Sequence, residues 1–207
     1  MKGKFIVFEG ITGSGKKTHI RLVTEKLQKL GKSVMLLNFP DYGSDIARLT
    51  RRIELDPFAL SLLFAADRAR SQERIKSLLE KENIVIVDRY CYSNFAYQSV
   101  KGVPLEWLME IEKNIVKPDI VILIDVPVDA SIGRIQQSNI EDFTKKEIME
   151  RLKRDRKRLE NIRETYLTLA KKNRDAKWFV VDGSKEIREN HEQVWGIISK
   201  ELKLEES

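Results

Sequence analysis

Three glycines and two lysines stand close together near the N-terminus, in a segment that reads Gly10-Ile-Thr-Gly-Ser-Gly-Lys-Lys-Thr18. The spacing fits the pattern G-x-x-x-x-G-K. In it, glycines let successive backbone N–H groups turn toward an anion, and the lysine contacts the β- and γ-phosphates of a nucleotide. An apolar stretch precedes the segment and an amphipathic stretch follows it, so the loop should lead from a buried strand into a helix N-terminus, whose dipole favours anions. The pattern predicts an ATP-phosphate loop made of Gly10, Ile11, Thr12, Gly13, Ser14, Gly15, Lys16, Lys17 and Thr18.

Lys17 departs from this pattern, because Ser or Thr usually follows the lysine of the motif, which is Lys16 here. An ammonium group cannot ligate Mg²⁺, and Thr18 lies about 100° further round the helix. The Mg²⁺ that accompanies ATP is therefore expected to rely on phosphate oxygens, water and a carboxylate elsewhere. Lys17 is interpreted as a second cation near the γ-phosphate.

A second group of charged residues, Asp88-Arg89, ends another apolar run. Asp88 is placed like a carboxylate that holds Mg²⁺ through water. Arg89 would project to where donor and acceptor phosphates meet, and its forked donors could bridge them. Both could instead cap the strand and the next helix, but a phosphate loop upstream favours the catalytic interpretation. Lys16, Arg89 and Asp88 are the candidate catalytic residues.

Strands and helices alternate along the chain, and these elements must position the charged groups. Apolar runs predict strands at Lys4–Glu9, Ser33–Asn38, Ile84–Asp88, Asp119–Asp125 and Lys177–Val181. These runs are continuous rather than alternating, as a parallel sheet covered on both faces requires. Helical periodicity predicts helices at Lys16–Leu30, Asp45–Glu54, Pro57–Lys81 and Thr144–Lys172. We expect an α/β fold, a three-layer, doubly wound, five-stranded parallel sheet, in one domain spanning 1–207.

Several blocks, taken in order, make the chain resemble the thymidylate kinase family of nucleoside monophosphate kinases. The blocks are Phe5–Thr18, Phe39-Pro40, Leu63–Arg68, Asp88–Gln98, Pro118–Arg134 and Arg163–Ala170. The resemblance implies the P-loop NTPase type of fold with a helical lid at about 136–153. It also implies transfer of the γ-phosphoryl group of ATP to dTMP, with Mg²⁺ as cofactor and a homodimer as the assembly.

The resemblance also implies roles for single residues at the acceptor site. Phe64 would stack on the pyrimidine, Arg68 would donate to a thymine carbonyl, and Asn94 would pair with the base edge. Tyr97 would lie under the sugar and exclude a 2′-hydroxyl. The full acceptor set is Phe39, Pro40, Tyr42, Phe64, Arg68, Arg89, Asn94 and Tyr97.

On the donor side, the resemblance places Arg134 against the adenine face, with the backbone near Asp182, Gly183 and Ser184 touching that base. Two positions depart from the family pattern. Thr12 stands where most members carry an acidic residue, and Tyr42 stands where many carry a phosphate-binding arginine. These departures leave the acceptor open, so a kinase for dUMP or a deoxynucleoside is an alternative. A nucleotide-binding regulator is a second alternative.

The stretch Lys145–Arg158 contains eight basic residues. Most are interpreted as a solvated helix face, while Arg151 and Arg154 are predicted to close over ATP as lid residues. The stretch lacks interleaved aromatics, which argues against a nucleic-acid interface despite the net charge of +6. Cys91 is the single cysteine, no signal peptide is evident, and runs such as Ile120–Ile124 are too short to cross a bilayer. We therefore expect a cytoplasmic protein with no membrane partner.

Overall fold

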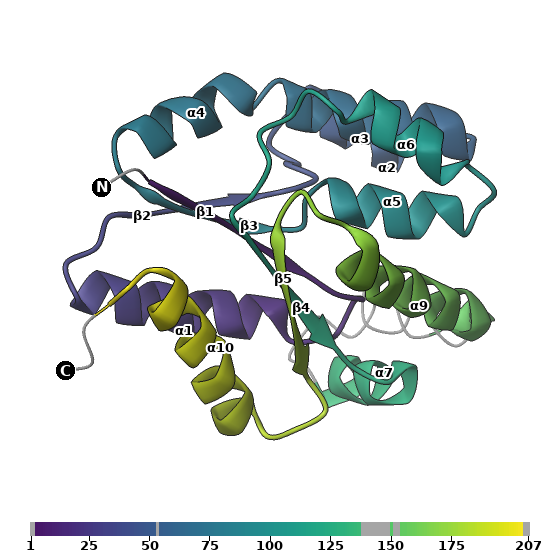
Figure 1. The fold of residues 1–207 in the computed structure, drawn as a ribbon. Helices are drawn as coiled ribbons and strands as arrows, with labels where there is room; N and C mark the ends of the chain where they lie inside the picture. The colour runs from purple at the N-terminus through teal and green to yellow at the C-terminus, as the bar shows by residue number, and fades with distance from the viewer. Residues whose placement is uncertain (1–2, 53, 138–149, 151–153, 205–207) are drawn as a thin grey trace.

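A computed structural model describes residues 3–52, 54–137, 150 and 154–204. Figure 1 shows a central sheet with helices on both faces. The strands are β1 (Lys4–Glu9), β2 (Val34–Asn38), β3 (Ile84–Asp88), β4 (Ile120–Asp125) and β5 (Lys177–Asp182). They are all parallel, in the order β2-β3-β1-β4-β5. The predicted five-stranded α/β fold is confirmed, and each strand lies within one residue of its predicted bounds at either end.

Side-chain alternation along the strands builds two separate cores. Phe5 and Val7 of β1 point into a core on one face, and Ile6 and Phe8 point into a core on the other. The first core is covered mainly by α4 (Gln72–Glu80), α5 (Cys91–Ser99), α6 (Leu105–Ile111) and α9 (Arg156–Lys172). The second is covered by α1 (Lys16–Lys29) and α10 (Ile187–Glu201). Because both faces of the sheet are buried, apolar side chains are needed on both sides of each strand, and this explains the continuous apolar sequences.

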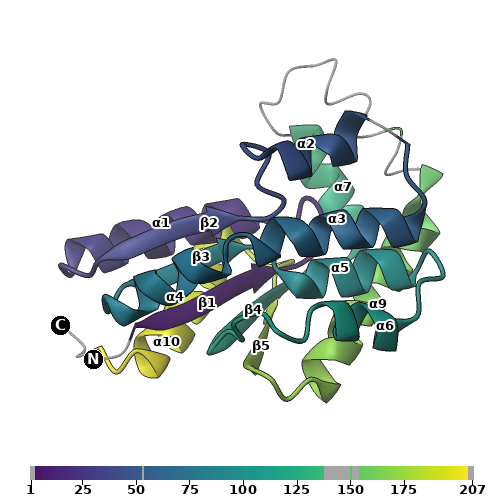
Figure 2. The ribbon, with the colours of Figure 1, turned by 90° about the horizontal axis from the view of Figure 1, so that it is seen from above.

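The strand order places β1 at the centre, between β3 and β4. Phe8 pairs with Asp88 and Glu9 pairs with Leu123, so the carboxyl ends of the three strands lie at the same edge of the sheet, with β4 running on to Asp125. In Figures 1 and 2, α2 (Asp45–Arg52), α7 (Val128–Gln137) and one end of α9 gather at this edge of the sheet. Ligands of doubly wound sheets bind at such an edge.

The predicted helix Pro57–Lys81 is wrong as a single element. It consists of α3 (Pro57–Ala69) and α4, separated at Arg70-Ser71. In a continuous helix the Arg68 carbonyl would accept from the Gln72 backbone N–H. Instead it accepts from the Ser71 backbone N–H at 3.0 Å and from the Gln72 side-chain amide at 2.8 Å. The side chain has replaced the backbone donor, and the helix turns there.

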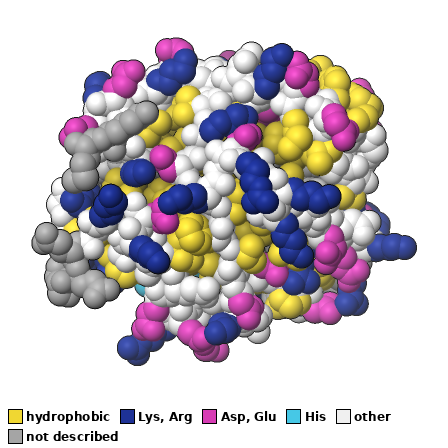
Figure 3. Space-filling model, in the orientation of Figure 1, with side chains coloured by type: hydrophobic (Ala, Val, Ile, Leu, Met, Phe, Trp, Pro, Cys, Tyr) yellow, Lys and Arg dark blue, Asp and Glu magenta, His cyan; other side chains and the backbone are white. Residues whose placement is uncertain are grey.

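The predicted helix Thr144–Lys172 is described as α9 from Arg156 onward, and most of the predicted lid at 136–153 lies outside the described residues. Within the described residues, no helix combines the length and the apolarity that crossing a bilayer requires. Figure 3 shows Lys and Arg side chains interspersed with Asp and Glu over the visible face.

Candidate active site

The glycine-rich segment forms the turn from β1 into α1, as predicted. Gly15 precedes α1 with φ of 96°, and Gly13 has φ of 78°, both in the left-handed region that favours glycine. A Cβ on Gly13 would also lie 2.6 Å from the Ser131 carbonyl oxygen of α7. Side chains are therefore excluded where the loop must curl. Within the loop, Ile11 and Ser14 are buried, while Thr12 and Lys17 are exposed.

The Lys16 side chain lies inside this turn and is 6% exposed. Its ammonium donates to the carbonyls of Gly10 at 2.9 Å and Ile11 at 3.0 Å, and to Ser14 Oγ at 3.2 Å. Burial, and then the nearby Arg89, lower the pKa of Lys16 to about 7. A polyphosphate in the loop would oppose this shift, because it favours the charged ammonium.

Arg89 follows β3 in an uncommon backbone conformation, with φ of 67°. Its backbone N–H donates to the Phe8 carbonyl at 3.0 Å, which ties it to the strand that leads into the loop. Its guanidinium donates to Ser93 Oγ at 3.0 Å and to the Tyr166 hydroxyl at 3.4 Å. Three elements (β3, α5 and α9) thus fix one guanidinium beside the loop.

Glu9, a residue not predicted for the site, organises these elements. It is fully buried at the end of β1. One carboxylate oxygen accepts from the backbone N–H groups of Tyr90 at 2.8 Å and Ser93 at 3.2 Å; the other accepts from Ser93 Oγ at 2.7 Å and the Tyr166 hydroxyl at 3.0 Å. Burial raises the pKa of Glu9, and Arg89 opposes that shift. An acidic residue closing a buried strand was the only sequence signal for it.

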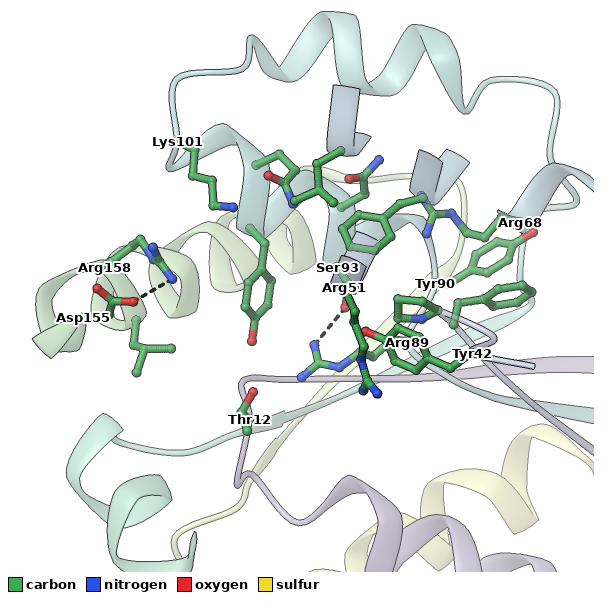
Figure 4. Close-up of a pocket in the computed structure, with 18 residues that line it drawn as sticks. Thr12, Tyr42, Arg51, Arg68, Arg89, Tyr90, Ser93, Lys101, Asp155 and Arg158 are labelled. Carbon is green, nitrogen blue, oxygen red and sulfur yellow. Dashed lines mark hydrogen bonds and ion pairs between the residues drawn. The ribbon is translucent and has the colours of Figure 1, made fainter. Parts of the chain in front are cut away.

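A cavity of about 460 Å³ opens beside Arg89 (Figure 4). It lies between the phosphate loop, α2, α3, α5 and the start of α9. All eight residues predicted for the acceptor site line it: Phe39, Pro40, Tyr42, Phe64, Arg68, Arg89, Asn94 and Tyr97. These eight residues come from three separate segments of the chain, 39–42, 64–68 and 89–97, which converge on one cavity next to the loop.

Comparison with known proteins agrees with this geometry. The sequence model of a family described as thymidylate kinase matches residues 8–194. The chain belongs to the thymidylate kinase family. It is 36% identical over 214 residues to a probable thymidylate kinase of Pyrococcus abyssi, with 98% of each chain covered. It is 38% identical over 202 residues to one of Sulfurisphaera tokodaii, with 97% of this chain and 98% of the relative covered. The predicted family is confirmed.

The end of the cavity at Arg68 is lined by polar groups. The Arg68 guanidinium forms a buried ion pair with Glu112, with 3.0 Å from Nε to the carboxylate. Asn94 also donates to Glu112, at 3.1 Å. The Asn94 Oδ1 and Gln98 Oε1 atoms are buried without a hydrogen-bond partner among the described residues. They could accept from the ring N–H of a pyrimidine.

The cavity rim carries charged residues that were not predicted. They are Arg51, Lys101, Asp155 and Arg158. Arg158 forms an ion pair with Asp155 at 2.9 Å, at the start of α9. Of the two arginines predicted for the lid, Arg154 is exposed and does not line the cavity, and Arg151 lies outside the described residues. Their assignment stays a prediction.

The predicted adenine-side residues come together on the other side of the loop. Arg134 donates to the Ser14 carbonyl at 3.2 Å and also to the Gly183 carbonyl. It therefore joins the phosphate loop to the end of β5. The Asp182 carboxylate accepts from the Ser184 backbone N–H at 3.0 Å, which shapes the turn that would touch the base.

The carboxylates near the loop differ in their capacity to hold Mg²⁺. Both oxygens of Asp125 accept from Arg163, at 2.6 and 2.7 Å, so that carboxylate is engaged. Asp88 Oδ1 is buried and has no hydrogen-bond partner within the described ranges. The described part of the chain contains no cluster of three or more His, Cys, Asp or Glu residues that could hold a metal ion without other ligands. An Mg²⁺ shell made of phosphate, water and Asp88 fits this arrangement.

Proposed function

We propose that this protein transfers the γ-phosphoryl group of ATP to dTMP and releases ADP and dTDP. The observation that carries the proposal is the position of the cavity. The whole predicted acceptor set lines this cavity, and Arg89 lies between the cavity and the phosphate loop. Membership of the thymidylate kinase family supports the same reaction.

The reaction asks the protein for positioning and charge rather than for a covalent intermediate. The loop and Lys16 would bind the β- and γ-phosphates of ATP. A phosphate oxygen of dTMP attacks the γ-phosphorus, the bond from that phosphorus to the β,γ-bridging oxygen breaks, and ADP leaves. Arg89 would contact both phosphates and stabilise the charge that shifts between them.

The residues around Asp88 suit Mg²⁺ held through water, as proposed from the free Asp88 Oδ1. Mg²⁺ bound with ATP would supply further charge neutralisation at the phosphate oxygens. Lys17 is exposed at the loop. Lys17 has no hydroxyl to ligate Mg²⁺, so we assign the protein's contact with the metal to Asp88, through water.

The base end of the cavity suits a pyrimidine. Phe64 offers a flat apolar surface, and Arg68 offers a donor held rigidly by Glu112. Asn94 Oδ1 offers an acceptor for the ring N–H. Tyr97 lines the part of the cavity where we place the sugar. Its ring would leave no room for a 2′-hydroxyl, which favours a deoxyribose.

A panel of acceptors tests the proposal. ADP formation from Mg-ATP would be followed with dTMP, dUMP, UMP, dCMP, dGMP, AMP and thymidine. We expect the highest kcat/KM with dTMP. A clear preference for dUMP or for a nucleoside would assign the cavity to another acceptor. ATP binding without transfer to any of them would favour a regulator.

We also propose a cytoplasmic single domain with a lid at about 136–153, and a homodimer. Support for the dimer comes from apolar side chains exposed on α3 and α6. Phe58 and Leu62 are 45% and 49% exposed, and Phe58 packs edge-on against Trp107 with ring centroids 5.2 Å apart. A contiguous exposed apolar patch of this kind is typical of an interface.

The substitution Leu62→Glu tests this surface. A carboxylate buried in an apolar interface is costly, so the variant should be monomeric where the parent is dimeric. Light scattering coupled to size exclusion measures the mass directly. Glu106→Gln, a change at the start of α6, is the control and should leave the mass unchanged. A parent protein that is monomeric at micromolar concentration would contradict the proposal.

A further inference from the structure

Glu112 is a buried carboxylate that lies behind the wall of the cavity. It follows the last residue of α6 and is fully buried, and it is not one of the residues that line the cavity. It accepts from Arg68 through Nε, at 3.0 Å, and through Nη2. The oxygen that accepts from Arg68 Nη2 also accepts from Asn94 Nδ2, at 3.1 Å. One carboxylate thus holds two cavity residues, from α3 and α5, side by side.

The contacts of the Asn94 amide determine which of its two ends can meet a ligand. Nδ2 lies 3.2 Å from the Ser61 carbonyl oxygen and 3.1 Å from Glu112. A carbonyl and an ionised carboxylate can only accept, so a flipped amide would place its oxygen against two acceptors. Oδ1 is therefore the end left for a ligand, and it is buried without a hydrogen-bond partner among the described residues. A buried acceptor without a partner is costly until a ligand supplies an N–H group.

Arg68 is fixed as a hydrogen-bond donor by the same carboxylate. Nε and Nη2 are both used by Glu112, and the remaining nitrogen, Nη1, has no hydrogen-bond partner within the ranges that the structure describes. Figure 4 shows Arg68 at the end of the cavity away from Asp155 and Arg158. A guanidinium can donate but never accept. This end of the cavity therefore presents one donor and one acceptor, and Glu112 contacts both residues that supply them.

A fixed donor beside a fixed acceptor distinguishes two kinds of pyrimidine. Thymine and uracil carry a carbonyl oxygen at C4 and an N–H group at N3, which match the donor and the acceptor. Cytosine carries an amino group at C4 and an unprotonated N3, so a donor would face a donor and an acceptor would face an acceptor. A site that leaves its buried polar groups unpaired with the wrong ligand rejects that ligand strongly.

We infer that Glu112 is the positioning residue that selects a 4-keto pyrimidine over cytosine, because it fixes Arg68 as the hydrogen-bond donor and Asn94 as the acceptor. The inference rests on the proposed function, since it concerns the acceptor base of that reaction. An ion pair that served only to join α3 to α6 would have no need of Asn94 on α5. The contact with the amide is what gives the carboxylate a part in reading the base.

Glu112→Gln tests this role, because a glutamine must turn its own N–H groups toward a donor of Arg68 or Asn94. Dissociation constants would be measured by calorimetry for dTMP and dUMP, and for dCMP in competition with dTMP. We expect dTMP and dUMP to bind about 10- to 100-fold more weakly to the variant. Binding of dCMP should change by less than about threefold, since it makes neither contact in the parent. The preference for dTMP over dCMP should therefore fall, while ATP binding stays unchanged.

Glu110→Gln makes the same chemical change at an exposed position of α6, and this control should keep the parental preference. If Glu112→Gln does not fold, Glu112→Asp takes its place, because it keeps the charge but is one methylene shorter and cannot reach both partners. Its preference should fall too. A parental preference for dTMP over dCMP in the folded variant would overturn the inference, as would equal weakening of all three nucleotides, which indicates a structural role. A parent protein without a preference for dTMP over dCMP would instead refute the proposed function.

Discussion

At the scale of single residues, the loop lysine is the group on which catalysis should depend most. Lys16 is buried among the oxygen atoms of Gly10, Ile11 and Ser14, where its ammonium is confined to the loop. Arg89 is equally constrained by Ser93 and Tyr166. Arg89 therefore needs little rearrangement when charge develops on a transferring phosphoryl group, while the Lys16 ammonium would exchange at least one of its three loop acceptors for a phosphate oxygen.

Replacing Lys16 with Ala should lower kcat by about 10²- to 10³-fold or more, because a preorganised charge next to the γ-phosphate is lost. Steady-state kinetics with saturating ATP and dTMP measure it, and circular dichroism checks that the fold is retained. Arg21→Ala, an exposed change on the same helix, should behave like the parent. Near-parental kcat in folded Lys16→Ala would refute the assigned role.

The pKa of Lys16, lowered to about 7, predicts a pH effect on ATP binding. Above pH 7 the free protein holds this side chain mostly neutral, while bound phosphates favour its charged form. Binding should therefore take up protons above pH 7 and weaken as the pH rises, until the pH exceeds the pKa in the complex. Calorimetry at pH 8 in two buffers of different ionisation enthalpy should give up to about one proton per ATP in the parent. The same uptake in Lys16→Ala would assign the proton to another group.

At the scale of elements, the buried ion pair Arg68–Glu112 connects α3 to the end of α6. Glu112→Gln would leave the buried Arg68 charge without its counter-ion, so the free energy of unfolding should fall by about 3–5 kcal/mol. The KM for dTMP should rise as well, since Arg68 would lose its fixed position. Urea denaturation measures the stability. Glu110→Gln, which breaks an exposed pair with Lys113, is the control and should change stability little.

Much of this arrangement could be predicted from sequence because local signals specify it. Each strand is a continuous apolar run, and the loop is recognisable from glycine spacing. The break between α3 and α4 could not be predicted, because it depends on the Gln72 side chain, whose other contacts are with Tyr90 and Val116, far along the chain. Glu9 and Glu112 were missed for the same reason. Their roles come from contacts between elements.

At the scale of the whole molecule, strand order explains why chemistry-bearing residues meet. With β1 central, the loop after it lies next to the residues that follow β3 and opens onto α3, α5 and α9. Segments around residues 12, 39–42, 64–68 and 89–97 thereby line one cavity (Figure 4). The sequence predicted the members of this set through family resemblance. Their common cavity is a property of the fold.

The most direct test of the account is to follow the γ-phosphoryl group itself. ATP labelled at the γ-phosphorus would be incubated with the protein, Mg²⁺ and dTMP, and the products separated by chromatography. The account predicts that the label appears in dTDP, one for each ADP formed, and that Arg89→Ala abolishes this transfer. Label found in inorganic phosphate, with dTMP unchanged, would contradict it.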